Sequence, residues 1–111
     1  MNSGSYASPF QVRPRAQNPV DCYVMEGEID GPEIQTIDHE MRVVIAHTQP
    51  SAGISDLTGV TNFNVPSHVM RNAAMKQPPP FPADTPRFIV APTDFLFGMM
   101  RMYELIADRP G

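Results

Sequence analysis

The sequence predicts an α/β fold in which helices cover a short, mostly parallel or mixed sheet. Strand-like and helix-like segments alternate along the 111 residues, and such alternation is typical of parallel strands joined by right-handed crossovers. The chain length suits one domain with one modest core. Hydrophobic residues make up 41% of the chain, which is enough to fill that core.

The first strand is expected near the start of the domain, after a leader. Residues 1–20 are polar and spaced by prolines, so we expect them to be extended or disordered. Residues 21–111 are expected to form the domain. The segment 21–29 alternates as an edge strand does, and the following Asp30-Gly31-Pro32 ends that strand and begins a helix.

The segment 33–49 predicts an amphipathic helix. Apolar residues recur at steps of three and four, which places them on one face: Ile34, Ile37, Met41, Val44 and Ile45. The other face is expected to hold Gln35, Asp38, Glu40 and Arg42. Asp38 and Glu40 are two residues apart and point in different directions on a helix. We therefore interpret this acid pair as solvated surface and not as an acid–base pair.

The middle of the chain predicts a short buried strand over 53–60, a loop over 61–65 and a helix from Pro66 to about residue 77. Prolines occupy five positions of 78–86. Because proline has no backbone N–H, that segment is expected to be a surface connection.

The last third of the chain predicts a strand and a helix. The run Phe88-Ile89-Val90 is apolar without alternation, which is typical of a central strand covered on both faces. Thr93 suits the N-cap of the last helix, with Asp94 in its first turn. That helix is apolar nearly all round.

Two segments resemble the STAS-like domain family, and more closely its small bacterial SpoIIAA-like members. They are 54–74, with its Asp-Leu-Thr-Gly-Val turn, and 87–111, with Phe97, Gly98, Arg101 and Tyr103. The resemblance covers about residues 22–109. It implies a non-enzymatic regulatory or protein-interaction domain, without a cofactor, that binds a protein partner or a second copy of itself.

The chain departs from this family in two places. Anti-sigma-factor antagonists of the family carry a phosphorylatable serine where Val65 stands here, after Asn64 in place of the acid. Ser67 lies two positions further on and is the possible phosphorylation site. Members also usually continue with another strand and helix after the final helix seen here. We expect either a shortened domain or a missing edge that something else supplies.

The expected partner-binding edge lies at the carboxyl ends of the strands, where α/β sheets bind ligands. It comprises Asp56, Thr58, Asn62, Asn64, Ser67, Thr93 and Asp94. The simpler alternative is that Asn64 or Ser67, and Thr93, only cap their own helices.

A second candidate is an apolar interface or pocket. The residues involved are Phe63, Phe88, Phe97, Met99, Met100 and Tyr103. Three interpretations remain open: ordinary core packing, an adaptable surface for a partner or a second copy, or a carrier pocket for a small apolar ligand.

Composition argues against other classes of function. The net charge of −4 with scattered Lys and Arg disfavours nucleic acid. His39 and His47 are eight residues apart, which is not a zinc-binding spacing, so no metal is expected. No apolar run is long enough to cross a membrane. The N-terminus lacks a secretory signal and Cys22 is the single cysteine, so we expect a cytoplasmic protein.

Overall fold

The computed structural model describes residues 10–12, 20–76 and 79–108 of the chain. In these residues the elements are β1 (Phe10–Val12), β2 (Val20–Asp30), α1 (Gly31–Thr48), β3 (Ala52–Asn64), α2 (Ser67–Ala74), β4 (Arg87–Val90) and α3 (Asp94–Ala107). The described strands form one sheet in the order β1-β2-β3-β4. β1 pairs antiparallel with β2, and the other pairs are parallel. The predicted α/β class, with three helices on a mostly parallel sheet, is confirmed.

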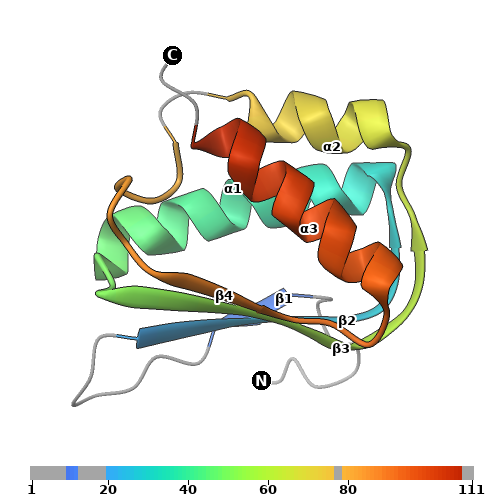
Figure 1. Cartoon of the computed structure of the whole chain (residues 1–111), viewed down its shortest axis with the longest axis horizontal. Coiled ribbons are helices and arrows are strands. Elements are labelled where there is room, and N and C mark those ends of the chain that lie inside the picture. The colour runs from blue at the N-terminus through green and yellow to red at the C-terminus, as the bar shows by residue number, and fades with distance from the viewer. Residues whose placement is uncertain (1–9, 13–19, 77–78, 109–111) are drawn as a thin grey trace, which may run out of the picture.

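All three helices lie on the same face of the sheet (Figure 1). For α1 and α2, which connect parallel strands, this follows from the strand order, because β2, β3 and β4 are laid down side by side in chain order. When every parallel crossover has the same hand and the sheet grows in one direction, each connecting helix falls on the same side. The other face of the sheet carries no helix in the described part of the chain.

The core fills the space between the helices and the covered face. α1 buries Ile34, Ile37, Met41 and Ile45, as the three- and four-residue spacing predicted. Strand residues close the core from below, notably Tyr23, Met25 and Leu57, each no more than 1% exposed. α2 contributes Met70, Ala73 and Ala74, and α3 contributes Leu96, Met100, Tyr103 and Ala107.

The start of α1 is held by a reciprocal pair of hydrogen bonds. The backbone N–H of Glu33 donates to the Asp30 side chain, and the backbone N–H of Asp30 donates to the Glu33 side chain, both at 3.0 Å. Pro32 lies in the first turn. This capping box satisfies two backbone donors that a helix leaves free at its N-terminus.

The prediction for β4 was wrong in one respect. β4 lies at the edge of the described sheet, and only its helix-facing side is covered. Phe88 is 57% exposed and Val90 is 46% exposed, while Ile89 between them is half-buried against the core. A run of three apolar residues resembles a doubly covered strand, but here every second residue faces away from the helices.

β3 is longer than predicted and β2 is not an edge strand. β3 continues through the expected loop to Asn64, because β2 is equally extended and pairs with it up to Asp30. Register shifts at Val24/Glu26 and Gly27/Glu28 accommodate extra residues in β3. β1, in the segment expected to be a leader, covers the middle of β2's outer edge. The rest of residues 1–19 lies outside the described residues.

Candidate functional site

The residues of the predicted partner-binding edge do not converge. Asp56 lies in the middle of β3, with Val24 and Val90 as its neighbours on either side. Asn64 lies eight residues further along β3 and pairs with Asp30. The paired residues Val24 and Asp30 are six residues apart on β2, so at about 3.3 Å per residue Asp56 and Asn64 are separated by roughly 20 Å. The described strand order also contains no reversal, which is where α/β sheets open a ligand crevice.

The remaining residues of that set lie at two different levels along the parallel strands. Thr93 and Asp94 follow β4, whose last residue is level with Asp56. Ser67 follows Asn64 at the far end, and Asn62 pairs there with Glu28. Thr58 lies next to Asp56, whose Oδ1 accepts hydrogen bonds from the Thr58 N–H at 3.0 Å and its hydroxyl at 2.7 Å. This local contact stabilises the irregular part of β3.

The capping interpretation is confirmed at one helix and wrong at the other. The Thr93 hydroxyl oxygen accepts from the Leu96 N–H at 3.2 Å, so Thr93 caps α3. At α2 the N-cap is Pro66, and no side chain makes a capping hydrogen bond there. Asn64 and Ser67 therefore do not cap α2. Ser67 is the exposed first residue of that helix.

The predicted apolar residues occupy three different environments. Met100 and Tyr103 are buried in the core, and Phe63 and Met99 pack partly against it. Phe88 is exposed on the uncovered face, and Phe97, at 45% exposure, lies on the outside of α3. The methionines of α3 thus belong to helix packing. The large apolar residues that α3 exposes are Phe95, Phe97 and Leu105.

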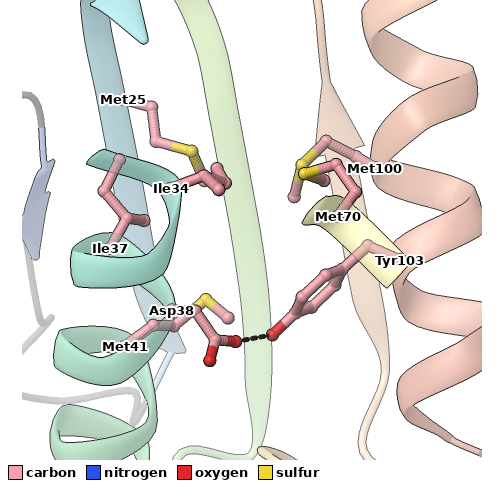
Figure 2. A pocket seen from close by; sticks show the side chains of 8 residues that line it. All are labelled: Met25, Ile34, Ile37, Asp38, Met41, Met70, Met100 and Tyr103. Carbon is pink, nitrogen blue, oxygen red and sulfur yellow. Dashed lines mark hydrogen bonds between the residues drawn. The ribbon is translucent and has the colours of Figure 1, made fainter. Parts of the chain in front are cut away.

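The helix layer encloses a cavity of only about 20 Å³ (Figure 2). It is lined by Met25, Ile34, Ile37, Asp38, Met41, Met70, Met100 and Tyr103. That volume holds about one water molecule, whereas sites for small ligands measure roughly 300–1,000 Å³. Phe63, Phe88, Phe97 and Met99 are not among its lining residues, so this cavity is not the carrier pocket that the sequence suggested.

Asp38 is buried in the helix layer, and its prediction as a solvated surface residue was wrong. Its side chain is 2% exposed, and both carboxylate oxygens accept from the Arg42 Nε, at 3.1 and 3.2 Å. The Tyr103 hydroxyl of α3 also donates to it (Figure 2), and Lys76 Nζ lies 3.7 Å away. The Arg42 Nη2 donates to the Ala73 carbonyl of α2. One carboxylate therefore links all three helices.

The spacing of α1 contained a signal for this burial. Asp38 lies four residues after Ile34 and three before Met41, so it falls on the apolar stripe. Burial, followed by the nearby negative charge of Asp38, raises the pKa of Tyr103 above its ordinary value. Tyr103 therefore stays a neutral hydrogen-bond donor.

A second polar cluster fixes β4 beneath α3. The guanidinium of Arg87 donates two hydrogen bonds to Asp108, at 2.6 and 2.5 Å, and lies 5.5 Å from the ring centroid of Phe81. Glu104 is buried next to this pair and accepts from Arg101 at 3.4 Å. Burial raises the pKa of Glu104 above its ordinary value. These contacts make β4 a firmly held edge of the sheet.

The uncovered face carries an apolar patch next to that edge. Residues paired across a sheet share a face, so Cys22, Ile54 and Phe88 form one row and Val24, Asp56 and Val90 form the next. Val24 is buried at 8% exposure, and Cys22, Ile54 and Asp56 are half-buried, so the exposed apolar surface is concentrated at Phe88 and Val90. Exposed apolar groups in contiguous positions are typical of interaction sites.

The free backbone edge of β4 is a poor template for another strand. Gly53 N–H donates to the Pro86 carbonyl at 3.0 Å, so by alternation Phe88 and Val90 also turn their backbone groups toward β3. Arg87 and Ile89 then turn theirs outward. β4 has only four residues and lies between Pro86 and Pro92, and both features protect edges from strand addition. The side chains of the uncovered face are the better candidate for a contact surface.

Comparisons with known proteins do not extend this description. The chain matches no family model, and no curated protein or solved structure is significantly similar to it. Among the residues that the structure describes, no group of three His, Cys, Asp or Glu side chains is placed to hold a metal ion. In the same residues, no helix is both long and apolar enough to span a bilayer.

Proposed function

We propose that this chain is a STAS-like interaction domain, which regulates a protein partner by binding it and catalyses no reaction itself. The observation that carries the proposal is the uncovered face of the sheet, where Phe88 and Val90 are about half exposed. The described helices all lie on the other face, so no described helix covers Phe88 and Val90. The resemblance of segments 54–74 and 87–111 to the STAS-like family supports the same class of function.

The size of the patch suits a contact of moderate affinity. Full burial of a Phe or Val side chain contributes about 1.5–3 kcal/mol. About half of each surface is still exposed at Phe88 and Val90, so covering both contributes roughly 1.5–3 kcal/mol in total. For both side chains together that corresponds to about a 10- to 150-fold change in affinity. A Phe88→Asp variant removes about half of that free energy and also introduces a charge into the contact.

The proposal is tested by comparing Phe88→Asp with Val43→Asp. Both residues are 57% exposed, but Val43 lies on α1 in the helix layer and Phe88 on the uncovered face. Wild type and both variants are first compared by sedimentation over a dilution series, which measures self-association. Wild type and both variants are then used as bait to capture partner proteins from the cells that make the protein. Each captured protein is purified, and its affinity for wild type and for each variant is measured by titration.

Phe88→Asp is expected to weaken the complex at least tenfold, whether the partner is another protein or a second copy. Val43→Asp is expected to change it less than twofold. Far-UV circular dichroism confirms that both variants are folded. Equal binding by wild type and Phe88→Asp in every complex would contradict the proposal.

A further inference from the structure

The uncovered face has an acidic half beside its apolar half. Alternate residues of β2 share a face, so Glu26 and Glu28 project on the same side as Cys22 and Val24. The register places Glu26 opposite Gly59, and the Glu26 side chain lies over that glycine. Both glutamates are exposed. With Asp56 they form a row of carboxylates that begins beside Val90 and runs toward the end of the β2–β3 pair.

No described cation balances these carboxylates. The salt bridges among the described residues involve Asp38, Asp108 and Glu104, all in the helix layer or turned toward it. The described Lys and Arg residues lie on the helices, just after α2, or on the helix-facing side of β4: Arg42, Arg71, Lys76, Arg87 and Arg101. Among the described residues, the uncovered face therefore combines an apolar patch with carboxylates that no described Lys or Arg pairs.

We propose that the occupant of this face is a basic amphipathic helix of a partner protein, and this inference rests on the proposed function. Its apolar side would cover Ile54, Phe88 and Val90, and its Lys or Arg residues would lie over Glu26 and Glu28. A helix fits better than a strand because the β4 edge is short and flanked by prolines. A helix is also the usual cover for an exposed sheet face.

The dimensions set the length of that helix. From Cys22 to Glu28 is six residues of β2, or roughly 20 Å at 3.3 Å per residue. A helix of about 14 residues spans the same distance at 1.5 Å per residue. A second copy of the chain is a poorer occupant. Most of its exposed apolar helix surface is on α3, and an α3-to-sheet contact is heterologous, so it leads to rings or open polymers and not to a closed dimer.

The test uses two labelled synthetic helices of about 14 residues, a length that spans the face. One has a Leu and Ala face and a Lys face, and the other has Glu at every Lys position. Binding to the full chain is measured by fluorescence anisotropy at ionic strengths of about 0.01 M and 0.15 M, where the Debye length is roughly 30 and 8 Å. At the lower ionic strength the Lys peptide is expected to bind at least tenfold more tightly than the Glu peptide. This difference between the two peptides is expected to shrink at the higher ionic strength.

Two double variants with the same net charge locate the contact. Glu26→Gln with Glu28→Gln removes two exposed charges from the uncovered face. Glu40→Gln with Asp84→Asn removes two exposed charges elsewhere. An exposed ion pair is worth about 0.2–1 kcal/mol, so the first variant is expected to weaken the Lys peptide roughly 2- to 30-fold. The second is expected to leave its affinity within twofold.

The outcomes separate this inference from the proposed function. Equal affinity for both peptides, equal effects of the two double variants, or no binding of the Lys peptide would overturn the basic helix as occupant. If the chain assembles with increasing concentration and Phe88→Asp abolishes that assembly, the occupant is a second copy of the chain and not a basic helix. In either case the proposed function stands or falls separately on whether Phe88→Asp weakens the native complex.

Discussion

The buried link between α1 and α3 predicts a large effect from removing a single oxygen atom. Tyr103→Phe keeps the ring in the core but removes the hydroxyl that donates to Asp38. Asp38 keeps the two Arg42 contacts at 3.1 and 3.2 Å and the Lys76 contact at 3.7 Å, so its charge stays paired. A hydrogen bond to a charged group contributes about 1.5–3 kcal/mol. At about 4 °C per kcal/mol for a domain of this size, Tm is expected to fall by roughly 6–12 °C.

Urea unfolding followed by far-UV circular dichroism measures this change, in a cycle with Asp38→Asn and the double variant. If the two side chains interact as described, their effects are not additive, and the coupling free energy is expected to be about 0.5–3 kcal/mol. A loss below about 0.5 kcal/mol for Tyr103→Phe, which is ordinary for a surface substitution, would refute the role given to this contact. Additive losses would refute it as well.

The same hydroxyl makes stability depend on alkaline pH. Burial and the Asp38 charge raise the pKa of Tyr103, and burial, with Asp21 as its hydrogen-bond partner, raises the pKa of Tyr23. Above about pH 10 the unfolded chain releases these protons while the folded chain keeps them. The free energy of unfolding then falls by about 1.4 kcal/mol per pH unit for each tyrosine. Tyr103→Phe is expected to halve that slope, and an unchanged slope would contradict the assignment.

Two further substitutions test the packing of the sheet and of α3. At Gly53 a Cβ would lie 2.8 Å from the Phe81 ring, whereas at Gly98 nothing lies within 4 Å. In urea unfolding, Gly53→Ala is therefore expected to destabilise the protein by about 1–3 kcal/mol. Gly98→Ala is expected to stabilise it by about 0.5–1 kcal/mol. A Gly53→Ala variant that is more stable than Gly98→Ala would contradict the close contact between Gly53 and Phe81. Burial raises the pKa of Glu104, so its stabilising contribution is present below its unfolded pKa and is lost as pH rises toward neutrality. Glu104→Gln is accordingly expected to raise the free energy of unfolding relative to wild type, and to raise it more at pH 7 than at pH 4. A difference between variant and wild type that does not change with pH would contradict this.

The helices were predictable from the sequence because local interactions decide them. The apolar spacing of α1, the turn at Asp30-Gly31-Pro32 and the cap at Thr93 act over three or four residues. The one error on α1 has a physical cause. Asp38 has the position of a core residue and the charge of a surface residue, and the hydrogen bond from Tyr103, 65 positions later, is a partner that no local pattern announces.

The candidate site was less predictable, because its residues share a surface only through strand pairing. Phe88 and Asp56 were identified from sequence, but as a pocket residue and an edge residue respectively. Glu26 and Glu28 were not identified as site residues, although their alternation with Met25 and Ile29 is the pattern of a sheet with one covered face.

The sequence by itself determined the class of the fold, the order of its helices and three parallel strands, and which side of α1 is buried. These features follow from the period of apolar residues and from local caps and turns, which need no distant partner. Only the tertiary structure decided that all helices lie on one face, that β4 is an edge and that Phe88 is exposed. Strand order brings together residues that are far apart in the chain. A run of three apolar residues does not indicate whether one or both faces of its strand will be covered by another layer.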